Sequence, residues 1–277
     1  MDRKNIVVFA DGADAGLTRV QMAVELGRET GAHVDVRFLY RVPELPVGVE
    51  LPALDGVFDR LVEQEHARAQ DTVRKLAAIG SPGPSFSIHA QSTEQGPLGR
   101  LAALAMQGVD LGVLALPEGD AEQAEILHSA LFASGAPCLA LPKWNTPHRW
   151  GERILVAWKA TSEAGRALSA ALPFLAKAKA VRLLVVNPRG AHVGEDNEGL
   201  ERLASRLLRH GVDVEAPLLI TAEAEEIGRA IADEGEGFGA DLVVMGAYGH
   251  SRFTEWVLGG VTRHMLQHGA VPLLLTH

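Results

Sequence analysis

The sequence has one cysteine, Cys138, in 277 residues, and this excludes an internal disulfide framework and a four-cysteine zinc site. Aromatic residues make up only 5%, and no apolar run approaches the ~20 residues that cross a bilayer. No block of basic residues is present, and the formal net charge is −9. An acidic chain repels nucleic-acid phosphates and anionic lipids, so we expect neither nucleic acid nor membrane as a partner. Since the first residues show no signal-peptide core, we expect a cytoplasmic protein.

The residues that are abundant indicate a packed α/β protein. Apolar residues make up 47% and charged residues 22%, which is typical of a globular chain. With so few aromatics, the cores must consist of Val, Leu, Ile and Ala, which suits helices packed on a parallel sheet. The length is sufficient for two domains of ordinary size.

The chain contains an internal repeat, because five segments of the first half recur in the same order in the second. The matching pairs are 5–12 with 153–160, 34–40 with 181–187, 97–103 with 226–232, 110–115 with 241–246, and 136–142 with 271–276. We therefore predict a duplication with two domains, residues 1–145 and 150–277. The boundary lies in a polar stretch with proline and glycine, a composition typical of linkers.

Short apolar runs alternate with segments of helical periodicity in both halves. The expected strands are 6–10, 34–40, 85–90, 111–116 and 138–141, then one from 153 and others at 181–186, 212–219, 242–246 and 273–276. Helices are expected at 15–30, stopped by Gly31, and from a Thr161/Ser162 cap, with Pro173 kinking or shortening the second. This alternation predicts right-handed crossovers and a parallel sheet that binds ligands beyond the carboxyl ends of its strands.

A glycine motif follows one of these strands in the second half. Gly246 comes directly after an apolar run, and Gly249 follows three residues later. After nine intervening residues come Gly259 and Gly260, followed by Val261 and Thr262. Glycine lets the main chain approach an anion closely, and the N-terminus of a helix presents unpaired N–H groups. The motif therefore predicts a phosphate cradle.

With this motif and the repeat, the chain resembles the tandem universal stress proteins. The resemblance implies an α/β fold of two tandem Rossmann-like domains, similar to the adenine nucleotide alpha hydrolases. Each domain would be a five-stranded parallel sheet with helices on both faces. The two would pair within the chain through their terminal strands, around Leu139 and Leu274. Whether the tandem unit also forms a homodimer stays open.

The sequence departs from the pattern of this family in both halves. The family places an aspartate after the first strand, at the adenine–ribose end; Asp11 matches it in the first half, but Lys159 stands there in the second. The hydroxyl residue that ends the family's glycine signature is Gly260 here. The first half lacks the glycine spacing, Pro117 removes a backbone donor, and Glu118 and Asp120 would repel a phosphate. We interpret the first half as a degenerate, structural copy.

The resemblance predicts a site for an adenine nucleotide, ATP with or without magnesium, in the second half. The predicted phosphate-binding residues are Gly246, Gly249, His250, Ser251, Gly259, Gly260, Val261 and Thr262. The predicted residues of the adenine end are Val156, Ala157 and Val186, with Lys159 as a further contact to an anion. We assign no catalytic residue and no metal ligand, and expect binding rather than efficient turnover.

Other interpretations stay open at this stage. The substitutions at Lys159 and Gly260 are also compatible with a ligand-free signalling or scaffold protein that acts through domain pairing. Related folds support adenylate-forming and nucleotide-hydrolysing enzymes, but a fold alone is a weak argument for activity. His264 and His268 lack the intervening glutamate of a zinc protease, which favours an ordinary helix face. Ser251 has no His/Asp partner motif, and Arg252 suits a phosphate contact and solvent equally well.

Overall fold

Five strands and four helices are present in the described residues of the first half. The computed structural model describes residues 4–42, 56–79, 85–93, 96–144, 149–190, 194–247 and 260–277, with only the backbone considered for 194–198. The elements of the first half are β1 (Asn5–Ala10), α1 (Asp14–Thr30), β2 (His33–Arg41), α2 (Val57–Ile79), β3 (Phe86–Thr93), α3 (Leu98–Ala105), β4 (Leu111–Ala115), α4 (Ala121–Ser134) and β5 (Cys138–Leu141).

The second half repeats this order of strands and helices. Its elements are β6 (Arg153–Ala157), α5 (Ser162–Leu175), β7 (Ala180–Pro188), α6 (Gly194–Arg209), β8 (Leu218–Ala222), a short 3₁₀ helix (Ala224–Glu226), α7 (Ile227–Phe238), β9 (Leu242–Gly246), α8 (Gly260–His268) and β10 (Leu273–Thr276).

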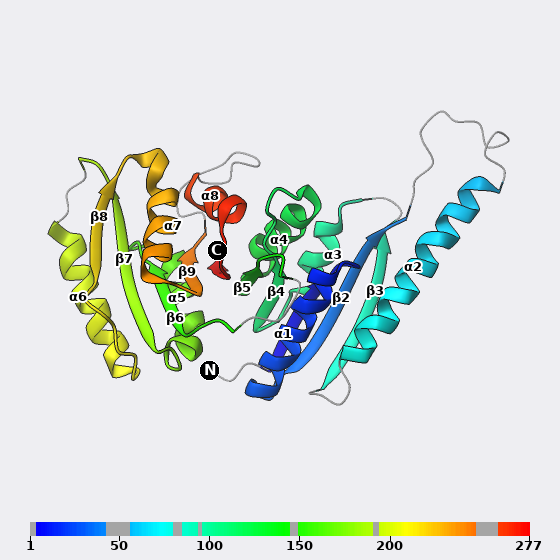
Figure 1. Cartoon of the computed structure of the whole chain (residues 1–277), viewed down its shortest axis with the longest axis horizontal. Helices are drawn as coiled ribbons and strands as arrows, with labels where there is room; N and C mark the ends of the chain where they lie inside the picture. Colours follow the sequence, from blue (N-terminus) through cyan, green and yellow to red (C-terminus); the bar gives the residue numbers. More distant parts are fainter. Residues whose placement is uncertain are drawn as a thin grey trace.

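The strands of both halves form one sheet in the order β3-β2-β1-β4-β5-β10-β9-β6-β7-β8. The pairing is parallel within each half and antiparallel where β5 meets β10, with Leu274 opposite Leu139. Figure 1 shows the first half in blue to green on one side and the second half in green to red on the other. The predicted α/β architecture with tandem parallel sheets is confirmed.

Helices cover both faces of the sheet because the strand side chains alternate between two cores. On β1, Val8 belongs to a core that includes residues of α1, α2, α5 and α6. Its neighbour Val7 belongs to a second core that includes residues of α3, α4, α7 and α8. Since successive strand residues point to opposite faces, the two cores lie on opposite sides of the sheet. Each core runs through both halves.

Two predicted helix signals are present in the structure. Gly31 ends α1 in the left-handed conformation, with φ 66°, and its N–H bonds to the carbonyl of Gly27. The Thr161 hydroxyl accepts a hydrogen bond from the Ala164 N–H at the start of α5. Pro173 lies in the last turn of α5, which ends at Leu175. These caps place the loops that follow β1 and β6.

The prediction of a strand over residues 212–219 is wrong. Only an isolated bridge joins Val214 to Val181, and strand β8 begins at Leu218. The residue before this strand is Pro217, which has no N–H to donate to a neighbouring strand. The apolar side chain of Val212 is buried in the core without belonging to a strand.

Two expectations from composition can be compared with the structure. In the part of the chain that the structure describes, no helix combines the length and hydropathy of a membrane span. Cys138 is fully buried on β5, and burial raises the pKa of its thiol to about 12. A thiol with so high a pKa is poorly reactive.

Candidate functional site

A pocket with a volume of about 230 Å³ opens at the carboxyl ends of β6, β7 and β9. Strands β6 and β9 are neighbours in the sheet, but the chain leaves them in opposite directions, toward β7 and toward β10. The pocket therefore lies at the switch point of the strand order, where open α/β sheets bind ligands.

The pocket wall is mainly apolar and carries one charged side chain among the lining residues that the structure describes. Its residues are Ala157, Trp158, Lys159, Thr161, Ala164, Leu184, Val186, Asn187, Pro188, Ile227, Ile231, Met245, Gly246, Gly260, Val261 and Thr262. The charged residue is Lys159. An apolar cavity with a few converging polar groups is the usual form of a small-molecule site.

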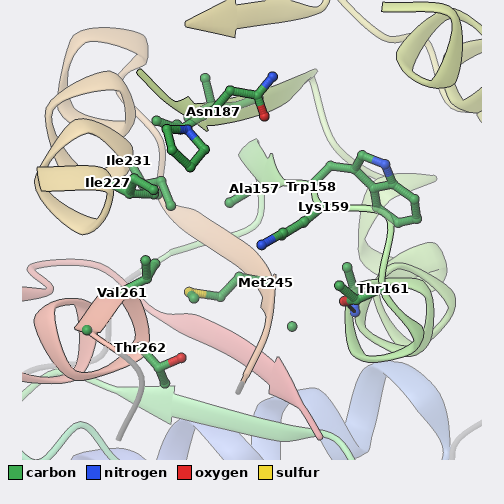
Figure 2. Close-up of a pocket in the computed structure, with 16 residues that line it drawn as sticks. Ala157, Trp158, Lys159, Thr161, Asn187, Ile227, Ile231, Met245, Val261 and Thr262 are labelled. Carbon is green, nitrogen blue, oxygen red and sulfur yellow. Dashed lines mark hydrogen bonds between the residues drawn. The ribbon is translucent and has the colours of Figure 1, made fainter. Parts of the chain in front are cut away.

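Lys159 lies in a tight turn between β6 and α5. The Thr161 N–H bonds to the Lys159 carbonyl at 2.7 Å, and the Trp158 N–H bonds to the Leu184 carbonyl at 2.7 Å. These bonds fix the backbone of the turn against β7. Figure 2 shows the Lys159 ammonium group directed into the pocket, while the Trp158 ring lies to one side. The side chain thus brings a positive charge to an apolar cavity.

The N-terminus of α8 forms another part of the wall. The helix begins at Gly260, and both Val261 and the buried Thr262 of its first turn line the pocket. The first N–H groups of a helix have no partner within it, and they carry a partial positive charge. Among the described residues, a Cβ at Gly260 would meet no atom within 4 Å. As far as the described residues extend, nothing blocks the approach of an anion to this helix start.

Gly246 has a packing function at the end of β9. A Cβ at this residue would lie 2.5 Å from the Ala164 nitrogen and 2.8 Å from the Glu163 carbonyl carbon. The Thr276 hydroxyl donates to the Glu163 carbonyl at 2.7 Å and holds the same helix start against β10. The close approach of α5 to the sheet explains this glycine without a ligand.

The structure places most of the predicted site residues that it describes around the same pocket. Those lining it are Ala157, Lys159, Val186, Gly246, Gly260, Val261 and Thr262. Those lying outside the described residues are Gly249, His250, Ser251 and Gly259. Val156 is buried in the core of the opposite face, beside the α5 residue Ala167. The prediction that Val156 lines the pocket is wrong, because neighbouring strand residues face opposite sides of the sheet.

Several lining residues were missed by the sequence prediction. Asn187 follows the apolar run of β7, and its place at a strand's carboxyl end was a usable signal. Ile227 and Ile231 are four apart on α7, the spacing of one helix face. Met245 is the residue before the first motif glycine. The distance in sequence of Asn187, Ile227 and Ile231 from the glycines concealed their common location, whereas Met245 was missed although it is next to Gly246.

Residues 151–277 match the model of the Universal stress protein family. This half of the chain is a universal stress protein domain. The whole chain is 23% identical to the universal stress protein Slr1230 of Synechocystis sp. over 302 aligned residues, which cover 98% of this chain and 99% of that one. The resemblance to the tandem universal stress proteins found in the sequence is confirmed.

Several solved structures resemble the whole chain. A universal stress protein from Archaeoglobus fulgidus superposes with a TM-score of 0.69 and 15% identity, covering 98% of this chain and 95% of that one. A putative universal stress protein from Pseudomonas aeruginosa gives a TM-score of 0.58 and 16% identity, with 99% and 93% covered. At these identities the comparison shows the shared fold.

The first half has the strand order of the universal stress protein domain but different chemistry after its first strand. Asp11, which corresponds to Lys159, accepts a hydrogen bond from the Ala13 N–H at 3.1 Å and pairs with Arg19 at 3.1 Å. The Arg19 side chain is only 3% exposed, and burial is the main cause that lowers its pKa. In the second half, the position corresponding to Arg19 is the buried Ala167.

The first half also has a carboxylate where the universal stress protein domain has a glycine helix start. Asp120 caps α4 and accepts hydrogen bonds from the N–H groups of Glu122 and Gln123 at 3.0 and 3.1 Å. Glu118 accepts a bond from the Lys143 N–H at 3.1 Å. Asp120 thus satisfies internally two N–H groups at the start of α4 that would otherwise attract an anion.

His264 and His268 serve helix packing in the universal stress protein domain. Their rings stack at a centroid distance of 4.7 Å on α8. A Cβ at Gly228 of α7 would lie 2.7 Å from the His264 Cβ, so the two helices touch closely here. Within the described residues, no cluster of three His, Cys, Asp or Glu side chains is able to hold a metal ion. Burial, followed by the charge of His268, lowers the pKa of His264.

Proposed function

We propose that the universal stress protein domain binds an adenine nucleotide, ATP, and that binding is regulatory rather than catalytic. The observation that carries this proposal is the apolar pocket at the switch point, with the start of α8 and Lys159 on its wall. A flat apolar ring and a polyanionic tail match these two parts of one cavity. In this proposal the chain divides into domains 1–145 and 150–277, acts in the cytoplasm and has one nucleotide site.

The apolar wall would hold the adenine. Ala157, Val186 and Met245 offer aliphatic contacts at the strand ends, and Ile227 adds one from α7. The Asn187 amide contributes a donor and an acceptor at the pocket wall, where a base edge could be recognised. These contacts favour a purine ring and leave the helix start for the phosphates.

The phosphate end would be held by the first turn of α8. Backbone N–H groups at Gly260, Val261 and Thr262 point from a helix N-terminus, and the Thr262 hydroxyl is a side-chain donor in the same turn. Magnesium would accompany the phosphates, because nucleotide-bound Mg²⁺ keeps most of its ligands from water and phosphate. No carboxylate belongs to the described wall, so no general base is assigned, and we propose binding without efficient hydrolysis.

Two measurements test this proposal. One identifies nucleotide that stays bound through purification, and the other titrates the protein with nucleotide. We expect mass spectrometry of denatured protein to release adenine nucleotide, and calorimetry to give one site per chain with ATP, with and without magnesium. A control variant, Val186→Asp, puts an unpaired carboxylate into the apolar wall and should abolish binding. If wild-type protein takes up no ATP at millimolar concentration, the proposed function is wrong.

Replacing Gly260 with serine should tighten ATP binding about ten- to a hundredfold. A hydroxyl at the helix start adds one hydrogen bond to a charged phosphate, worth about 1.5–3 kcal/mol. The side chain fits, since a Cβ here meets no described atom within 4 Å. Calorimetric titration of wild type, Gly260→Ser and Gly260→Ala measures the effect. The alanine variant controls for loss of glycine, and equal affinities of the serine and alanine variants would refute a phosphate at this residue.

A second candidate function is a ligand-free scaffold, and the continuous sheet favours it. Strands β5 and β10 join the two halves through backbone pairing at Leu139 and Leu274, which makes the tandem unit rigid without a ligand. In a scaffold, Lys159 and Gly260 would mark a lost site. The titration above separates the two functions, because a scaffold binds no ATP and responds to neither Gly260→Ser nor Val186→Asp.

A further inference from the structure

Lys159 gives the pocket a positive charge in addition to the one at the helix start. Figure 2 shows Lys159 and Thr161 on one side of the pocket, Val261 and Thr262 on the other, and Met245 between them. The loop of Lys159 follows β6, whereas α8 follows β9, so different elements present the two charges. A ligand with a single anionic tail would contact only one of these two positive charges fully.

The corresponding position of the first half carries a residue of opposite charge. There Asp11 is neutralised by the buried guanidinium of Arg19 and also accepts from the Ala13 N–H. In the second half both members of that pair are changed, to Lys159 and to the small Ala167. The ion pair, of which only the arginine is buried, is thereby replaced by an ammonium group directed into an apolar cavity. The residue that follows the first strand is therefore negatively charged in the first half and positively charged in the second.

The sign of this charge determines which ribose the site would accept. A carboxylate beside a ribose accepts hydrogen bonds from its hydroxyl groups, whereas a cation there accommodates a phosphate on the ribose, as in dinucleotide-binding α/β folds. A lysine is a mobile point charge with three donors, well suited to a phosphate of variable position. The described wall holds no carboxylate that would oppose a second phosphate.

We infer that the pocket prefers an adenine nucleotide phosphorylated on its ribose as well as on its 5′ oxygen. Lys159 contacts the ribose phosphate, and the start of α8 contacts the 5′ phosphate. The ligand class is that of the nucleoside 2′,5′- and 3′,5′-bisphosphates, free or as part of a larger cofactor. This inference rests on the proposed nucleotide site and assigns its specificity to one residue.

Two isomeric ligands test the inference directly. Adenosine 5′-diphosphate and adenosine 3′,5′-bisphosphate have the same atoms and two phosphates each, and they differ only in where the second phosphate lies. For the wild type, we expect calorimetry to give about tenfold tighter binding of the 3′,5′-bisphosphate, or of its 2′,5′ isomer, than of the diphosphate. Lys159→Met keeps an unbranched side chain of nearly the same length without the charge, and it should remove this preference. Lys159→Asp should reverse it.

The outcomes separate the inference from the proposed function. If the protein binds the diphosphate, and binds both bisphosphates equally well or more weakly, the inference is wrong. The proposed nucleotide site would not be affected by that result. A preference that survives in Lys159→Met would overturn the assignment to Lys159. Binding of none of the three ligands would instead contradict the proposed function itself. Since Lys159 is exposed on a turn, circular dichroism and thermal melting should show that both variants fold.

Discussion

Replacing Asp11 with alanine is expected to destabilise the first half of the chain by about 3–5 kcal/mol. The substitution leaves the guanidinium of Arg19 without its charged partner in a position that is 3% exposed. That group keeps one hydrogen bond, from its Nη1 to the Phe9 carbonyl at 2.5 Å. Its Nε already has no partner among the described residues. A buried charge that loses its counter-ion costs far more free energy than a surface pair does.

Urea unfolding followed by far-ultraviolet circular dichroism, with hydrogen exchange of β1 and α1 peptides, measures this loss half by half. The matched control is Asp71→Ala, which removes a carboxylate paired with Arg74 and Lys75 on the surface of α2. We expect that control to cost under about 1 kcal/mol. The double variant Asp11→Ala/Arg19→Met should recover much of the stability, because an apolar side chain replaces the orphaned charge. Equal losses in Asp11→Ala and Asp71→Ala would contradict the buried pair.

We interpreted the first half as a degenerate copy from its sequence, but the sequence showed only part of the chemistry of this half. The ion pair is the part that it did not show. The missing glycines and the acidic residues Glu118 and Asp120 were visible there, and they indicated that a phosphate would be repelled. The pairing of Asp11 with Arg19 was not visible, because it depends on a long side chain folding back from α1 to the end of β1. Asp11, which matches the family's aspartate in sequence, is thus a partner in a structural ion pair.

Local patterns predicted the fold well where one physical signal dominated. Gly31 and Thr161 supply a helix end and a helix start through their own backbone or side-chain geometry. The pairing of strands around Leu139 and Leu274 followed from the family resemblance, and the structure places these two leucines opposite each other. The strand bounds predicted near 212–219 were wrong because the apolar residues of this segment were given more weight than Pro217. Apolar character alone does not position a strand beside a proline.

The candidate site was predicted less completely because it is assembled from three strand ends and three helices. Sequence spacing identified the start of α8 and Lys159, but it assigned Val156 to the pocket instead of to the opposite core. It also interpreted Gly246 as a phosphate contact, whereas the approach of Ala164 is itself sufficient to require glycine there. A motif glycine can therefore be needed for packing whether or not a ligand binds beside it.

Replacing Leu274 with alanine is expected to cost about 2–5 kcal/mol and to weaken the coupling of the two halves. Leu274 is fully buried at the middle of the ten-stranded sheet, opposite Leu139, which is 1% exposed. Truncation leaves a cavity at the one place where the two parallel sheets join. Leu139→Ala should cost a similar amount, and Leu104→Ala, at a leucine that is 55% exposed, should stay within about 0.5 kcal/mol.

A double-mutant cycle of Leu139→Ala and Leu274→Ala, measured by urea unfolding, tests the pairing itself. Residues in contact show a coupling energy of about 0.5–3 kcal/mol, so the double variant should lose less stability than the sum of the single losses. Strict additivity would mean that the two strands do not touch in solution. With coupling present, the unfolding of the two halves should separate into distinct transitions in the double variant, because the sheet that joins them is weakest there. Helix α8, whose first turn lines the pocket, lies between β9 and β10 in the chain. ATP affinity measured on the same variants would therefore show how strongly the nucleotide pocket depends on the pairing of β5 with β10.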